Sequence, residues 1–339
     1  MIHVLWIVSS LGPGGWAFSG GFSIKHEIRV LAYNSCFMSA SAYSQRVAFV
    51  GVGRMGASMA RRLHDVGITV SAIYDVNTPI AQELAKELGA DAPSLLTDVA
   101  VSADVIITVV TDDAAMYTIY VAEGDSLMRH AAAKTFINCA TVTPEVHLQI
   151  GERVAAAGGA TIAACMAGSI TQARDGTLYL ICGGEQSIYE KVRPLLEAMG
   201  ASRYVGSAER AAQVKALVNM LMNINTAALA EALGLGAYLG IDLDQLRDIF
   251  AHTGANSRVL VTDGPDMQAR DHEVYFAAAH AAKDSGIAVM LARERGLSLP
   301  LAEATKSRYD ELVRLGFAES DKSAIAELTF PGRVGAGAR

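Results

Sequence analysis

Apolar residues follow two different spacings along the chain, and each spacing predicts a different kind of structure. From Val47 onward, short runs of consecutive apolar residues alternate with longer stretches in which apolar and polar residues recur at helical spacing. The short runs predict buried strands, and the longer stretches predict amphipathic helices. Because strands alternate with helices, we expect a parallel sheet with helices on both faces. Strands are expected at 47–52, 68–75, 103–110, 134–141, 160–166 and 177–184, and helices at 56–67, 79–90 and 143–159.

After about residue 207 the strand-like runs stop and only helical spacing continues. Helices are expected at 208–241, 243–254, 276–296 and 300–316, separated by turns rich in glycine, proline and aspartate. A length of 339 residues also favours two domains over one. We therefore predict an α/β domain over 46–207, an all-helical domain over 208–330 and a tail over 331–339. Residues 1–45 fit neither pattern and are expected to be a poorly ordered extension, with Met38 as a hypothetical true start.

Composition and charge exclude several classes of partner. Apolar residues make up 51% of the chain and charged residues 19%, which is typical of a globular protein with a large core. The net charge of −7 leaves no basic surplus to neutralise phosphates, so neither nucleic acid nor an anionic membrane is an expected partner. The most apolar long segment, 214–241, still contains Lys215 and Glu231, which favours a buried helix over a membrane span.

The four cysteines are far apart and form no C-x-x-C pair. Neither a disulfide framework nor a metal site is therefore expected. The first residues also lack the basic start and the unbroken apolar run of a secretory signal. Both observations favour a reduced, cytoplasmic location.

The segment VAFVGVGRMGASMARRL at 47–63 places three glycines between a predicted strand and a predicted helix. Gly51, Gly53 and Gly56 match G-x-G-x-x-G. In this motif the first glycine forms a tight turn, the second lets a pyrophosphate approach and the third allows close helix packing. Amide groups at the helix start would bind the phosphates. Taken alone, the motif fits a glycine-rich turn without any ligand equally well.

The end of the next predicted strand adds a second feature of dinucleotide binding. Asp75 comes about 20 residues after the glycine loop, where a carboxylate accepts hydrogen bonds from the adenosine ribose. This carboxylate would repel a 2′-phosphate and so favours NAD, whereas Arg54 keeps NADP open as the second cofactor. The alternative for Asp75 is a solvated residue at a strand end. We predict a Rossmann-type dinucleotide-binding domain in which the cofactor contacts Gly51, Val52, Gly53, Arg54, Met55, Gly56, Asp75, Val76 and Asn77.

Lys215 and Asn219 are polar residues within the long apolar helix. Their four-residue spacing puts both side chains on one helix face, and their neighbours are almost all apolar. Burial lowers the pKa of a lysine, and an amine whose pKa approaches neutrality exchanges protons efficiently with an alcohol. The alternative is a lysine whose amine reaches the surface, with the asparagine as a packing residue.

At these residues the chain resembles a known family. VAFVGVGRMGASMARRL is similar to the G-x-G-x-M-G-x-x-M-A signature of the β-hydroxyacid dehydrogenases, the family of 3-hydroxyisobutyrate dehydrogenase, with Met55 and Met59 at its methionine positions. The similarity continues through ADVIITVVTDD, NCATVTP, AACMAGSITQARDGTLYLICGG, VKALVN and AAKDSGIA, in family order over 46–328. The resemblance implies an α/β fold with an N-terminal Rossmann-type doubly wound parallel sheet and a C-terminal all-helical domain.

The resemblance also implies roles for single residues. Lys215 matches the family's catalytic lysine, and Asn219 matches the asparagine that orients the substrate. Lys283, followed by Asp284, matches a lysine that closes over the nicotinamide, and Thr141 matches a threonine near the ribose. An ordinary charged pair on a helix surface is the alternative for Lys283, and a plain strand-end hydroxyl is the alternative for Thr141. The block after the third strand adds Val109, Val110 and Thr111 as cofactor contacts.

One family motif is altered in this chain. The family's substrate loop usually has D-A-P-V-S-G-G, whereas this chain has AACMAGS. Ala167 replaces the serine that helps to hold the substrate carboxylate, Gly168 keeps the middle glycine, and Ser169 could supply a displaced hydroxyl. Cys165 and Met166 are expected to widen or soften the pocket wall. We expect the loop to contact substrate through Ala167, Gly168 and Ser169, but it leaves the identity of that substrate open.

Together these features predict an NAD(P)-dependent oxidoreductase. It would transfer hydride between a small β-hydroxy acid, or the corresponding semialdehyde, and the nicotinamide, with Lys215 as general acid and base. The long apolar helix predicts a homodimer or homotetramer. Two alternatives stay open: a non-catalytic dinucleotide-binding sensor or scaffold, and a reductase of small semialdehydes or imines with an altered substrate loop.

Overall fold

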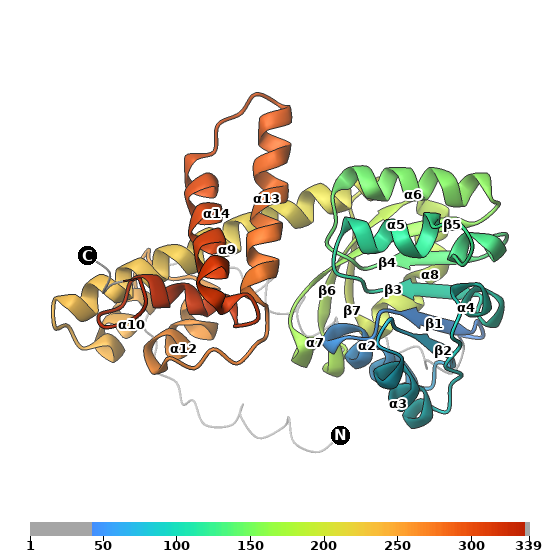
Figure 1. Cartoon of the computed structure of the whole chain (residues 1–339), viewed down its shortest axis with the longest axis horizontal. Helices are drawn as coiled ribbons and strands as arrows, with labels where there is room; N and C mark the ends of the chain where they lie inside the picture. Colours follow the sequence, from blue (N-terminus) through green and yellow to red (C-terminus); the bar gives the residue numbers. More distant parts are fainter. Residues whose placement is uncertain (1–42, 336–339) are drawn as a thin grey trace, which may run out of the picture. The chain divides into compact units, whose positions relative to one another are not determined.

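The computed structural model describes residues 43–335. Its amino-terminal part contains a seven-stranded sheet (Figure 1). The strands lie in the order β2-β1-β3-β4-β5-β6-β7. All neighbouring pairs in this sheet are parallel except β5 and β6, which are antiparallel. The strand bounds are β1 Val47–Val50, β2 Val70–Tyr74, β3 Val105–Thr108, β4 Thr135–Asn138, β5 Ala160–Ala167, β6 Leu178–Gly184 and β7 Gly200–Tyr204.

The sheet is therefore mixed, whereas the sequence pattern predicts a wholly parallel sheet. The connection from β5 to β6 holds only one short helix, α7 (Ile170–Asp175). A parallel crossover needs a dozen or more residues, so this shorter connection returns the chain antiparallel. The strand β7 is absent from the predicted set because its sequence, GASRY, contains no run of apolar residues.

Helices cover both faces of the sheet, as predicted. Phe49 of β1 belongs to a core cluster with residues of α2, α3 and α8, whereas its neighbour Ala48 belongs to a second cluster with α4, α5 and α6. Successive strand residues point to opposite faces, so the two clusters are the two buried sides of one sheet. The bounds are α2 Arg54–Asp65, α3 Thr78–Leu88, α4 Leu96–Ser102, α5 Asp113–Val121, η3 Leu127–His130, α6 Pro144–Ala156 and α8 Gln186–Met199.

The strand order reverses direction at β1. From β1 the chain moves outward to β2 and then crosses back to β3 on the other side of β1. In doubly wound sheets a crevice opens at such a point, beyond the carboxyl ends of the strands, and ligands bind there. The loops that follow β1 and β3 therefore mark the expected position of the cofactor.

One long helix, α9 (Ala208–Tyr238), begins directly after the sheet and continues into the helical part. Ser207 caps it by accepting a hydrogen bond from the backbone N–H of Arg210 at 3.2 Å. Ala211 packs with β5 and β6, whereas Leu233 packs with the other helices. α9 therefore belongs to both halves. The remaining elements are α10 Leu243–Ala251, α11 Arg258–Thr262, α12 Gly264–Ala269, α13 Ala278–Glu294, α14 Pro300–Leu312, η4 Val313–Phe317 and η5 Lys322–Leu328.

By length and composition α9 could span a membrane, with a mean hydropathy of 1.2 over its most apolar window. Lys215, Asn219 and Asn223 are nevertheless buried inside the protein, where each contributes to the polar side of the helix. Within the window 44% of the residues are buried, so the helix is only partly covered, whereas the sequence predicts a buried helix. Its exposed residues include Leu217 and Leu221.

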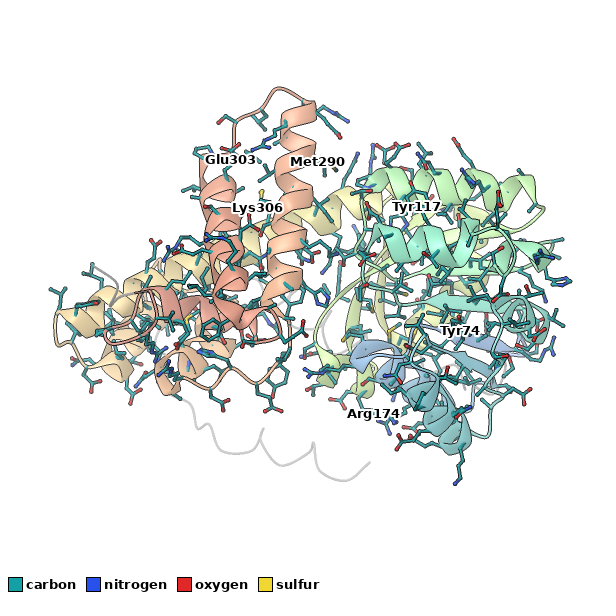
Figure 2. All side chains as sticks on the ribbon, viewed as in Figure 1. Tyr74, Tyr117, Arg174, Met290, Glu303 and Lys306 are labelled. Carbon is teal, nitrogen blue, oxygen red and sulfur yellow. The ribbon has the colours of Figure 1, made fainter. Side chains whose placement is uncertain are left out.

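α13 and α14 pack side by side. Met290, Glu303 and Lys306 line the groove between them (Figure 2). A Cβ atom at Gly286 would lie 3.2 Å from Cε of Lys306, so the glycine permits this close approach. The packing fixes α13, whose first turns carry Lys283 and Asp284.

The predicted domain division stays a prediction, because the described residues form a single unit by their contacts. β7 ends at Tyr204 and α9 begins at Ala208, close to the predicted boundary. The amino-terminal extension and Met38 lie outside the described residues, apart from 43–45.

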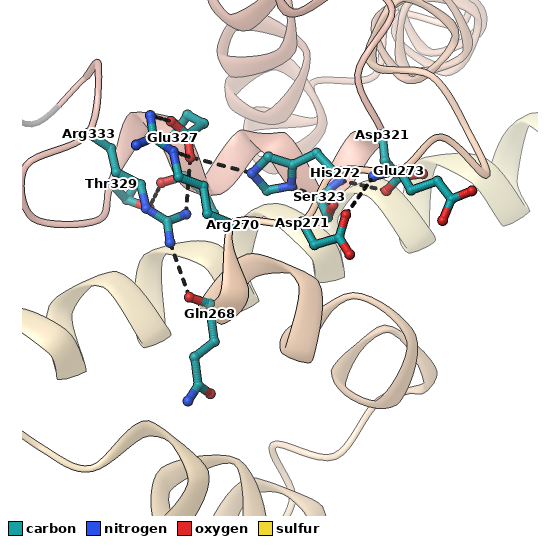
Figure 3. Close-up of polar contacts among 11 residues, drawn as sticks. Gln268, Arg270, Asp271, His272, Glu273, Asp321, Ser323, Glu327, Thr329 and Arg333 are labelled. Carbon is teal, nitrogen blue, oxygen red and sulfur yellow. Dashed lines mark hydrogen bonds and ion pairs between the residues drawn. The ribbon is translucent and has the colours of Figure 1, made fainter.

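A buried carboxylate fastens η5 to the segment before α13 (Figure 3). The Glu327 side chain is 1% exposed and accepts two hydrogen bonds from Arg270, at 3.1 and 2.7 Å. Arg333, from the predicted tail, forms an ion pair with Glu327 at 3.2 Å. His272 lies 3.4 Å from Glu327 and 3.0 Å from the Ser323 hydroxyl. This network holds the chain that leads into α13.

Replacing Glu327 with Gln is expected to lower the free energy of unfolding by about 2 kcal/mol, because the charge of Arg333 loses its buried partner, whereas Arg270 is 55% exposed and stays solvated. Chemical denaturation would measure the loss. Glu319→Gln, at an exposed position, is the matched control and should leave stability unchanged. Equal stability of the two variants would show that the Glu327 network contributes nothing.

Candidate active site

The glycine loop brings β1, α2 and β3 together at backbone distance. Gly51 has φ +88°, and a Cβ atom there would lie 2.3 Å from the carbonyl oxygen of Val109. A Cβ atom at Gly56 would lie 2.1 Å from the carbonyl oxygen of Gly51. Both glycines are therefore required by the packing of the protein itself. Val110 also faces the turn, with Cγ1 3.5 Å from the same hypothetical Cβ of Gly51.

Gly53 is different, because within residues 43–335 no atom beyond its chain neighbours and its own helix lies within 4 Å of a Cβ atom built there. It is the residue before α2, and no side chain caps that helix. The protein thus leaves open space beside the helix start, where a pyrophosphate could approach the free amide groups. This arrangement fits a dinucleotide. Met55, in the first turn of α2, packs against the core.

Asp75 follows Tyr74, the last residue of β2 (Figure 2). Its carboxylate accepts hydrogen bonds from the backbone N–H groups of Val52 and Asn77, both at 2.8 Å. Each oxygen keeps a free lone pair for a ribose hydroxyl. The glycine loop therefore holds Asp75 at the crevice, and Val76 beside it is 88% exposed.

The side chain of Arg54 contacts the helical part of the protein. Its guanidinium donates a hydrogen bond to the carbonyl oxygen of Val274 at 2.6 Å. The predicted effect of Arg54 on the choice between NAD and NADP stays a prediction.

Lys283 links α13 to the loop after β4. Its amine donates a hydrogen bond to the carbonyl oxygen of Thr141 at 2.5 Å and lies 2.9 Å from a carboxylate oxygen of Asp284. The pKa of Asp112 is lowered mainly by the hydrogen bond from the backbone N–H of Ala115, and the positive charge of Lys283 contributes to the same shift. The structure thus brings the predicted residues Lys283 and Thr141 into contact. Thr111 is exposed and donates to Asp112 at 2.9 Å.

Lys215 is 8% exposed, and its amine lies inside the protein. Burial lowers the pKa of Lys215, and the charge of nearby Asp284 opposes that shift. Cys165, like Asp284, raises the pKa of Lys215, whereas the charge of Lys283 lowers it further. Lys215 is therefore an amine that loses its proton more readily than a solvated lysine.

Asp284 interacts with both predicted catalytic residues, through its charge with Lys215 and through a hydrogen bond with Asn219. The Asn219 amide donates a hydrogen bond to Asp284 at 2.5 Å, and both side chains are 2% exposed. This use of its N–H group fixes the orientation of Asn219. Sequence reasoning treats Asp284 only as the neighbour of Lys283, because the fold alone brings α13 against α9.

Asn223 continues the polar face of α9 by one more turn. Its amide donates to the carbonyl oxygen of Ala281 at 3.2 Å and to the hydroxyl of Ser285 at 3.0 Å. Sequence reasoning missed this residue, although the four-residue spacing from Lys215 through Asn219 was a signal that could have found it.

The altered substrate loop follows β5. Gly168 has φ +132°, and Ser169 caps α7. Both the backbone N–H and the hydroxyl of Ser169 donate to the side-chain oxygen of Gln172. The expected effect of Met166 on the pocket wall is wrong, because Met166 packs against the core cluster on the opposite face of the sheet. Cys165 does lie on the Lys215 side.

Comparison with known proteins identifies the family. Residues 46–208 match the NAD-binding domain of 6-phosphogluconate dehydrogenase, and residues 210–329 match the NAD-binding domain of NADP-dependent 3-hydroxyisobutyrate dehydrogenase. NAD-dependent L-serine dehydrogenase of Pseudomonas aeruginosa is 30% identical over 85% of this chain and 98% of its own length. The chain belongs to the β-hydroxyacid dehydrogenase family. It is an NAD(P)-binding oxidoreductase of the 3-hydroxyisobutyrate dehydrogenase type, as the resemblance implies.

Two further relatives agree with this assignment. Glyoxylate/succinic semialdehyde reductase 1 of Arabidopsis thaliana is 28% identical over 83% of this chain and 97% of its own length. The structure of Mycobacterium tuberculosis 3-hydroxyisobutyrate dehydrogenase with L-serine superposes with a TM-score of 0.74 at 25% identity, covering 83% of this chain and 98% of that one. The predicted fold, a Rossmann-type sheet followed by a helical part, is confirmed.

Two glycine substitutions separate cofactor binding from packing. Gly53→Ala adds a methyl group in open space, so the thermal unfolding midpoint should hold while NADH affinity falls about tenfold or more, through weakened contacts to the charged pyrophosphate. Gly56→Ala meets the Gly51 carbonyl and should lower the unfolding midpoint. Fluorescence titration and thermal scans measure both effects. Equal destabilisation by the two substitutions would contradict this account of Gly53.

Proposed function

We propose that this family member transfers hydride between a small β-hydroxy acid, or the corresponding semialdehyde, and a nicotinamide. Lys215 acts as its general acid and base. The observation that carries the proposal is the buried amine of Lys215, with its lowered pKa, beside the Asn219–Asp284 hydrogen bond. A proton acceptor needs a pKa near the working pH, and burial moves Lys215 in that direction.

In this proposal, Asp284 and Asn219 support the proton transfer by Lys215. In oxidation, neutral Lys215 takes the hydroxyl proton, and the carboxylate of Asp284 stabilises the ammonium that forms. Asn219, fixed by Asp284, holds the substrate oxygen at reacting distance, which supplies rate through orientation. The nicotinamide, when bound, supplies the acceptor or donor of hydride. In reduction Lys215 returns the proton.

We further propose NAD as the preferred cofactor, with NADP as the alternative. The support is Asp75, whose carboxylate stands at the end of β2 and would repel a 2′-phosphate. The order of affinities for NADH and NADPH tests this preference.

A homodimer or homotetramer in the cytoplasm is also proposed. Leu217 and Leu221 of α9 are 54% and 58% exposed, which favours a protein partner over water. Cys139, Cys165 and Cys182 are free and buried, which suits a reducing compartment.

The alternatives are a non-catalytic dinucleotide-binding module and a reductase of small semialdehydes or imines. The observation that favours them is the substrate loop, which lacks the family serine at Ala167. Retention of Lys215 and Asn219 in a buried site favours the dehydrogenase.

Lys215→Ala is expected to lower kcat by about 100- to 10,000-fold, because general acid and base catalysis contributes that much. NADH affinity should stay nearly unchanged, since the glycine loop and Asp75 are intact. Absorbance of the reduced cofactor over a panel of hydroxy acids and semialdehydes gives the rates. Retained turnover in this variant would refute the role of Lys215, and no turnover by the unaltered protein would favour the non-catalytic module.

Asp284→Asn tests the electrostatics of the same site. It keeps an acceptor for Asn219 but removes the charge that raises the pKa of Lys215, so that pKa falls further. The oxidation rate increases with pH as Lys215 loses its proton. The rising limb of the kcat/KM profile should therefore move to lower pH, by about one unit.

Asp248→Asn, exposed on α10, is the control for this pH measurement and should leave the limb in place. If the rising limb of the kcat/KM profile moved to higher pH in the Asp284→Asn variant, the assigned electrostatics would be contradicted.

A further inference from the structure

One wall of the site beside Lys215 is built from two antiparallel strands. Their register pairs Cys165 with Ile181 and Ala167 with Tyr179. Residues directly opposite each other share a sheet face, as do alternate residues along one strand. These four residues therefore form one strip, which we call the β5–β6 wall.

The β5–β6 wall lies next to the start of α9. Cys165 and Ile181 pack with Ala211, one helical turn before Lys215. Burial raises the pKa of the Cys165 thiol to about 12, while the charge of Lys215 lowers this pKa and the charge of Asp284 raises it. The thiol is therefore neutral in the working pH range. Ala167 lies two residues farther along β5, at its carboxyl end, where ligands of such sheets bind.

Among the described residues, the side-chain donors of this loop that could hold a carboxylate are missing or already used. Ala167 offers a methyl group where the family signature has a serine hydroxyl. The backbone N–H and hydroxyl of Ser169 are both occupied by Gln172. Burying a carboxylate without side-chain donors is unfavourable, whereas covering Ala167 and the half-exposed Tyr179 with a hydrocarbon group is favourable.

We propose that the β5–β6 wall selects substrates that present a hydrocarbon substituent, and not a carboxylate, to Ala167. The inference rests on the proposed function and names its substrate class. The reacting hydroxyl or carbonyl oxygen meets Lys215 and Asn219, an alkyl or aryl group lies on the wall, and any acid group of the substrate is esterified or directed away from Ala167.

A matched pair of substrates tests this selection. 3-Hydroxyisobutyrate and its methyl ester have the same reacting alcohol and differ in the charge at the carboxyl group. The unaltered protein should use the ester with a kcat/KM about tenfold higher or more. Ala167→Ser restores a hydroxyl donor and should shift this ratio toward the acid by about tenfold or more. Ala160→Ser, at the opposite end of β5, is the control and should leave the ratio unchanged.

Two results would overturn the inference: preference of the unaltered protein for the free acid, or a ratio that Ala167→Ser does not move. Dissociation constants of isobutyrate and methyl isobutyrate for the NADH complex give a readout that needs no turnover. If neither alcohol is oxidised, the proposed function fails, and the binding ratio alone still decides the selectivity of the wall. Tighter binding of methyl isobutyrate supports the wall, and tighter binding of isobutyrate refutes it.

Discussion

The site depends on one amine that is held out of water. Lys215 is buried on α9, and burial disfavours its charged form. An isolated ammonium at this position would be costly, but Asp284 supplies the opposite charge from α13. The competition between burial and Asp284 sets how easily Lys215 takes and gives a proton. The arrangement of α9 and α13 is therefore the constraint on which the chemistry rests.

The fold supplies that arrangement from two directions. The first turns of α9 pack on β5 and β6, so Lys215 stands at a fixed distance from the carboxyl edge of the sheet. α13 is held by α14 and by the network around Glu327, and Lys283 reaches from it to the carbonyl oxygen of Thr141. The contacts of Lys283 and Arg54 join the helical part to the cofactor edge.

Local pattern predicts much of this structure, because the strands are short apolar runs and the helices have regular spacing. The glycine loop and the Lys215–Asn219 pair were visible for the same reason, since their residues are close in sequence. Asp284 and Asn219 are 65 residues apart, so their hydrogen bond needed the tertiary packing of α9 on α13. The reversal at β6 was missed because loop length, and not apolar pattern, sets strand direction. Met166 was misplaced because the pattern did not fix which face of β5 it occupies.

The most direct test of the account is the titration of Lys215 itself. NMR of protein with 13C-labelled lysine, assigned by comparison with Lys215→Arg, follows this amine as pH changes, without any substrate. The account predicts a midpoint below 10.5, the ordinary value for a lysine. A midpoint at or above 10.5 would mean that Lys215 is solvated or fully paired, and the proposed proton transfer would have no basis.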